Sequence, residues 1–88
     1  MAPASKTVEH VIKVNAIYHG HFRGSIEVWS DIVERRSSEP FTDCLVAYTS
    51  DPTVMDTVEI ARKQHTLLKV TAWEGQSGYH LSSCEELS

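Results

Sequence analysis

The chain has 88 residues, a net charge of −4 and a hydrophobic content of 41%. A chain of this length forms one domain with a small core, and this hydrophobic content excludes a wholly disordered chain. The acidic balance disfavours unselective binding to phosphate backbones or anionic membranes, which depends on a surplus of Lys and Arg, although it is compatible with a local basic patch.

Neither a membrane span nor a secretory signal is recognisable. No apolar run approaches the roughly 18 residues that a membrane-spanning helix needs, and residues 1–6 lack the apolar region of a signal peptide. We therefore expect a cytoplasmic protein with no membrane partner. Cys44 and Cys84 fit no CxxC or metal-knuckle spacing, so we expect two free thiols. No cofactor is expected.

Residues 1–6 are predicted to be a flexible lead-in, and residues 7–88 a single domain that begins with two strands. Residues 7–18 alternate with a period of two, which predicts a long half-buried strand. Its predicted core side carries Val8, Ile12, Val14, Ala16 and Tyr18, and Val11 and Ile17 interrupt the polar side. After a loop at 19–24 with two glycines, residues 25–34 alternate again and place Trp29 opposite the core side.

The second half of the domain is predicted to hold a strand, a helix and two more strands. Residues 41–49 are mostly apolar, which is typical of a central strand. A helix is predicted over 52–65, because Ser50 or Asp51 can cap it and Pro52 suits its first turn. Its inward side would carry Val54, Val58 and Ala61. Strands are predicted over 67–73 and 79–84, with a hairpin loop at 74–78.

Three strands, a helix and two strands form an order that is similar to the OB-fold, a partly open Greek-key barrel. This resemblance concerns architecture, covers nearly the whole chain and is accompanied by no family sequence motif. It implies a mainly β fold, a five-stranded barrel with one helix. An SH3-like barrel and an α+β sheet covered by one helix are the alternatives; the first does not normally carry a four-turn helix at this place.

Nothing in the sequence predicts catalysis. There is no GxxxxGK[ST] or GxGxxG loop, and no carboxylate pair or Ser-His-Asp set stands at a telling spacing. We therefore expect no enzyme and no catalytic residue. His19 and His21 share a face in an extended stretch, but a metal site would need further ligands such as His80 or Cys84. Two solvated loop histidines, with no metal, are the favoured interpretation.

Aromatic and basic residues carry the leading functional hypothesis. The OB resemblance implies an oligonucleotide groove formed by the outer face of the second and third strands and by the loops at 19–24 and 74–78. The aromatic side chains would stack on bases and the cations would pair with phosphates. The residues predicted to contact the ligand are Phe22, Arg23, Trp29, Lys69 and Trp73. Acidic residues in or beside the groove oppose this: Glu27, Asp31, Asp43 and Glu74.

Two alternatives stay open. Trp29 and Trp73 would instead lie in the core or plug the ends of the barrel. The domain would instead bind a protein partner or form a homodimer, through the apolar side chains of Val11 and Ile17 or through the acidic end after Cys84. The sequence thus predicts a non-catalytic binding module, with single-stranded nucleic acid as the first ligand and a protein as the second.

Overall fold

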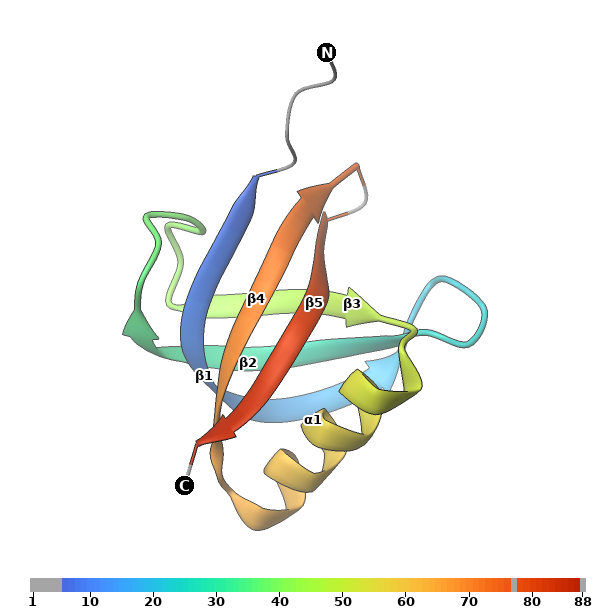
Figure 1. Cartoon of the computed structure of the whole chain (residues 1–88). Helices are drawn as coiled ribbons and strands as arrows, with labels where there is room; N and C mark the ends of the chain where they lie inside the picture. Colours follow the sequence, from blue (N-terminus) through green and yellow to red (C-terminus); the bar gives the residue numbers. More distant parts are fainter. Residues whose placement is uncertain (1–5, 77, 88) are drawn as a thin grey trace.

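Five strands close into a barrel with one helix beside it (Figure 1). The structure, a computed structural model, describes residues 6–76 and 78–87, so the predicted lead-in lies outside the described residues except for Lys6. The elements are β1 (Thr7–His19), β2 (Ile26–Arg35), β3 (Cys44–Thr49), α1 (Pro52–Gln64), β4 (Leu67–Gly75) and β5 (Gly78–Leu87). This order confirms the predicted OB-like barrel, and the closed sheet excludes the open α+β alternative.

The barrel runs β1-β2-β3-β5-β4 and returns to β1. Every pairing is antiparallel except that of β3 with β5. This parallel seam is short, with Ala47 opposite Tyr79 and Tyr48 opposite His80. The five strands are therefore joined by four long ladders and one brief contact.

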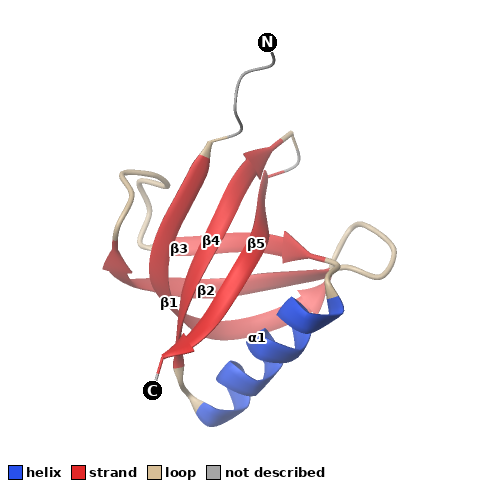
Figure 2. Cartoon of the chain, viewed as in Figure 1, coloured by secondary structure: helices blue, strands red, loops and turns tan. Residues whose placement is uncertain are grey.

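The helix α1 packs its apolar side against β1, β4 and β5 (Figure 2). It begins where predicted, because the Asp51 carboxylate accepts hydrogen bonds from the backbone N–H groups of Thr53 (2.8 Å) and Val54 (3.4 Å). Val54, Val58 and Ala61 are buried, as the sequence predicts. Among the described residues, no helix is long and apolar enough to cross a membrane.

β-Bulges change which residues of β1 face the core. Val14 is opposite Ser30 and Ala16 is opposite Trp29, so Asn15 is an extra residue in β1. Beyond it the alternation is reversed. Ile17 packs against the core and Tyr18 is 56% exposed, so the prediction that Tyr18 faces the core is wrong. Val11 is also buried, and the predicted apolar patch of Val11 and Ile17 is not formed.

Three predicted boundaries also shift. The third strand begins at Cys44 rather than at residue 41, and Phe41 lies in the preceding loop with 91% of its surface exposed. The last strand is longer than predicted and includes Glu85 and Glu86, so the acidic end is part of the barrel. The fourth strand reaches Gly75, which leaves a shorter hairpin turn than predicted.

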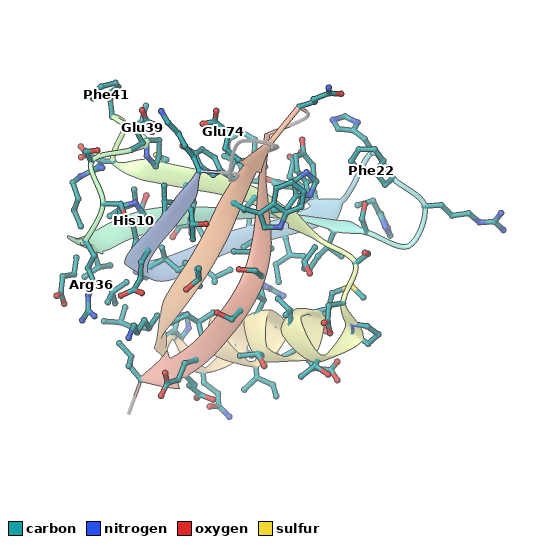
Figure 3. All side chains as sticks on the ribbon, turned by 45° about the horizontal axis from the view of Figure 1, so that its top comes forward. His10, Phe22, Arg36, Glu39, Phe41 and Glu74 are labelled. Atoms are coloured by element: carbon teal, nitrogen blue, oxygen red, sulfur yellow. The ribbon has the colours of Figure 1, made fainter. Side chains whose placement is uncertain are left out.

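The side chains that hold the long connection between β2 and β3 against the barrel include those of His10 and Arg35. His10, which is fully buried, accepts a hydrogen bond at Nδ1 from the Arg36 N–H (3.2 Å). Its Nε2 lies 2.7 Å from the carbonyl oxygen of Glu39 and therefore donates, because a carbonyl can only accept (Figure 3). The Arg35 guanidinium donates to the carbonyl of Thr42 (2.6 Å) in the same connection.

Candidate nucleic-acid interface

Aromatic side chains gather on the outside of the barrel, over the β1–β2 loop, β2, β3 and the β4–β5 hairpin. Four of them are well exposed: Tyr18, Phe22 (49%), Trp29 (45%) and Trp73 (38%). Both tryptophans are therefore outside the core, against the alternative that they fill it. We call the aromatic surface the set of Tyr18, His21, Phe22, Trp29, Tyr48, Trp73 and His80.

One half of the aromatic surface is centred on His80 of β5. The Trp73 ring stacks on the His80 ring at 4.3 Å with an 18° angle between the planes. Tyr48 (6.0 Å) and Phe22 (6.4 Å) lie on other sides of the same imidazole. The stack requires glycine at position 75, because a Cβ there would lie 2.8 Å from the Trp73 ring. Residues from the first loop, β3, β4 and β5 thus meet across the short parallel seam.

The other half is centred on Glu27 of β2. Its Cα is opposite Tyr18 of β1 on one side and opposite Tyr48 of β3 on the other. The Trp29 indole donates a hydrogen bond to its carboxylate at 2.5 Å. This bond, followed by one from the Tyr48 hydroxyl, lowers the pKa of Glu27. Tyr18 meets Trp29 edge to face at 6.1 Å, so Glu27 lies within a frame of three aromatic rings.

The β1–β2 loop has a defined conformation that fixes Phe22. The Phe22 carbonyl accepts from the backbone N–H of Ser25 (3.0 Å) and from its hydroxyl (2.6 Å). The Gly20 N–H donates to the Ser25 carbonyl (3.0 Å), and a Cβ at position 20 would lie 2.2 Å from the Ser25 Oγ. Gly24 has a φ of +77°, which favours glycine. The loop therefore fixes the backbone at Phe22.

Arg23 joins this surface through a hollow next to the loop. The hollow has a volume of about 280 Å³, and its wall is formed by Phe22, Arg23, Ser25, Tyr48, His80 and residues 49–50. Aromatic rings therefore lie beside a cationic residue and several hydroxyl groups. Such a combination offers a stacking face, hydrogen bonds and a phosphate contact at one place.

Lys69 is not brought to the aromatic surface. Its Nζ lies 3.7 Å from the Glu9 carboxylate, which also meets Arg36 at 3.4 Å. Trp73 is four residues further along the same strand, which corresponds to about 13 Å. Its predicted role in ligand contact therefore stays a prediction, because the contact found for Lys69 is with Glu9 and not with the other candidate residues.

Of the four acidic residues named as unfavourable, Glu27 is the one that lies within the aromatic surface. Glu74 belongs to the neighbourhood of Lys6 and Tyr79, where its charge contributes to a raised pKa of the Tyr79 phenol after the larger effect of burial. Asp31 is opposite Cys44 at the beginning of β3, and the Asp43 carbonyl accepts from the Ile32 N–H. Glu27 is thus the carboxylate that is hydrogen-bonded within the aromatic surface, and Asp31 lies two residues beyond Trp29 on the same outer face of β2.

Four members of the aromatic surface are absent from the sequence prediction. Tyr48 has a readable signal, because it alternates with buried Ala47 and Thr49 and so faces outward. His21 and His80 were considered only as metal ligands, yet each packs against Tyr48. Tyr18 has no such signal, because the extra residue Asn15 reverses its side.

Metal and thiol chemistry have little support in the described part of the chain. Within it, no three His, Cys, Asp or Glu residues are placed to hold a metal ion. Cys44 and Cys84 are free thiols, as predicted. Burial raises the pKa of the Cys84 thiol to about 11, which makes it a poor nucleophile.

Comparisons with protein-family models, with curated proteins and with solved structures found no match to this chain. The site is therefore interpreted from its geometry and chemistry alone.

Proposed function

We propose that the protein is a non-catalytic module that binds single-stranded nucleic acid on the aromatic surface. The observation that supports the proposal most is the position of the exposed rings. Trp29 and Tyr48 belong to β2 and β3, Phe22 lies in the β1–β2 loop, and Tyr18 and Trp73 lie near the ends of β1 and β4 that lead into the two loops. OB-fold domains bind oligonucleotides on this part of the barrel, the outer face of the second and third strands with the adjoining loops. Flat exposed rings on neighbouring strands suit successive unpaired bases, since each base has two faces that can stack.

Stacking, rather than charge, is expected to provide most of the affinity. Arg23 is the cationic residue beside the hollow, and the chain as a whole carries −4. The slope of log K against log salt for single strands is about −0.7 per phosphate neutralised. With one or two phosphate contacts we therefore expect a slope of about −0.7 to −1.4, much shallower than that of a basic nucleic-acid binder.

The test compares two exposed phenylalanines at opposite ends of the molecule. Phe22 belongs to the aromatic surface, whereas Phe41 lies in the β2–β3 connection (Figure 3). Replacing Phe22 by Ala removes a stacking partner worth about 1–3 kcal/mol, so the affinity for a single-stranded oligonucleotide should fall about five- to 150-fold. Phe41→Ala is the matched control and should leave the affinity unchanged.

Binding is measured by tryptophan fluorescence, because Trp29 and Trp73 are both exposed within the site. We expect saturable quenching of this fluorescence by the oligonucleotide, with an affinity that falls slightly as the salt concentration rises. No change of signal with any oligonucleotide at high protein concentration would contradict the proposal, and so would an equal loss of affinity in the Phe22 and Phe41 variants.

A second candidate function is protein binding or self-association through the β2–β3 connection. The observation in its favour is the exposure of Phe41, together with the half-exposed Val33 near the end of β2. A single large apolar side chain in water is compatible with a partner that covers it. Sedimentation of the wild type and of Phe41→Ala over a range of concentrations tests this, since a concentration-dependent dimer should be lost in the variant.

A further inference from the structure

Glu27 is the feature of the aromatic surface that stacking does not explain. A carboxylate among base-stacking rings opposes the approach of phosphate, so a site evolved only for stacking gains nothing from it. Within the described residues, no Lys or Arg forms an ion pair with Glu27. The Trp29 indole, first, and then the Tyr48 hydroxyl and the charge of His21 lower the pKa of its carboxyl.

The Glu27 carboxylate keeps hydrogen-bonding capacity beyond its bond to the Trp29 indole. An ionised carboxylate offers about four acceptor positions and no donor. The Trp29 indole occupies one of them, and the Tyr48 hydroxyl contributes to lowering the pKa of the carboxyl. The side chain is partly exposed, so at least two acceptor positions remain for a ligand that stacks on the rings around it. A ligand that satisfies both must present two adjacent donors on one edge.

We propose that Glu27 selects guanine among the four bases of a single strand. This inference rests on the proposed function and assigns its base preference. Guanine carries two adjacent N–H donors, N1–H and the 2-amino group, on its pairing edge. Cytosine and adenine offer one amino group there beside an unprotonated ring nitrogen. Thymine and uracil offer one N–H between two carbonyl oxygens, which face a carboxylate unfavourably. Recognition of pairing edges is how proteins read unpaired bases.

The frame around Glu27 fixes the direction in which it accepts. The Trp29 indole donates to the carboxylate at 2.5 Å, and Tyr48 is opposite Glu27 on β3, so the rotation of the carboxylate is restricted. Tyr18 and Trp29 provide the ring faces beside it. A base that stacks on these rings brings its pairing edge to the carboxylate without a loop rearrangement. The same position therefore provides both the stacking contact and the hydrogen bonds that distinguish the bases.

The test uses oligothymidine strands of about nine nucleotides, within the site size of one OB domain, with one central base varied. The central base is guanine, hypoxanthine, adenine, cytosine or thymine. Hypoxanthine is guanine without the 2-amino group, so it separates the two hydrogen bonds. A single guanine in a thymidine strand cannot form a four-stranded assembly. We expect guanine to be preferred over thymine about tenfold, with hypoxanthine between them.

The Glu27→Gln variant tests the residue itself. Its side-chain oxygen can still accept from the Trp29 indole, but the second oxygen is replaced by a donor. We expect the ratio of the affinities for the guanine and thymine strands to fall below about twofold in this variant, and the ratio is compared because it cancels any general change in binding. Glu59→Gln, an exposed position on α1, is the control and should keep the preference.

Each outcome has a distinct meaning. If none of the strands binds, the proposed function fails and the inference fails with it. If all five bind with equal affinity, the proposed function stands and the guanine assignment is wrong. If guanine is preferred equally by the wild type and by folded Glu27→Gln, another group reads the base and the assignment to Glu27 is overturned.

Discussion

Replacing His10 tests how the β2–β3 connection is held to the barrel. The imidazole is fully buried and joins the Arg36 N–H to the Glu39 carbonyl. His10→Ala removes two hydrogen bonds of about 1 kcal/mol each and leaves a small cavity that costs about another 1 kcal/mol. We expect a loss of about 3 kcal/mol in the free energy of unfolding. For a domain of this size that lowers Tm by roughly 12–24 °C.

Urea unfolding, followed by tryptophan fluorescence and by circular dichroism, measures this loss. His19→Ala is the control, because His19 is exposed and its replacement should change stability by less than about 0.5 kcal/mol. His10→Phe keeps a ring but neither hydrogen bond, so it should still lose about 2 kcal/mol. If His10→Phe is as stable as the wild type, the two hydrogen bonds do not stabilise the fold and the reasoning is refuted.

Three further predictions concern other parts of the chain. Asp51→Ala removes the helix cap and should cost about 1 kcal/mol in chemical unfolding, whereas Asp51→Asn should cost much less. At pH 8 a pKa of about 11 leaves about 0.1% of Cys84 as thiolate, so a thiol reagent should label exposed Cys44 first; equal labelling rates in the folded protein would contradict this. The hydrogen bonds to Glu27, from Trp29 first, lower its pKa, so they stabilise the fold at neutral pH and are lost as the pH falls through that lowered value. In a variant in which Trp73 is replaced, the fluorescence of Trp29 should therefore change with pH, with a midpoint below pH 4.5. This change should be absent when Glu27→Gln is added.

Much of the fold is predictable because its signals are local. The cap at Asp51 and the spacing of Val54, Val58 and Ala61 define the helix without reference to the rest of the chain. The unbroken alternation in the first part of β2 places Trp29 outside correctly. In such segments the side chain's direction follows from the backbone period alone.

The parts that could not be predicted depend on pairing between distant segments. The extra residue Asn15 is defined by the register of β1 against β2, and the alternation of polar and apolar residues in β1 does not predict it. It moves Tyr18 from the predicted core to the candidate site. The meeting of Trp73 with His80 likewise requires the hairpin register and Gly75, although Trp73 itself was expected outside the core in the leading hypothesis.

Phe41 illustrates a different limit of sequence reasoning. An apolar residue next to an apolar strand was assigned to that strand, but β3 begins three residues later. The bonds that His10 and Arg35 make to the connection hold its backbone in a conformation that strand pairing does not require. Side-chain contacts from β1 and β2 thus hold residues 41–43 outside β3.

A ligand bound across the short parallel pairing of β3 and β5 would stabilise the closed barrel. Tyr48 and His80, which are opposite each other in that seam, both belong to the aromatic surface. A strand of nucleic acid that stacks across them would connect β3 to β5 from outside and supply the contacts that the brief ladder lacks. Binding would then raise the free energy needed to open the barrel by about 2.7 kcal/mol at a ligand concentration one hundred times Kd. The amide protons of the seam, rather than those of the four long ladders, are where slower hydrogen exchange should register the ligand.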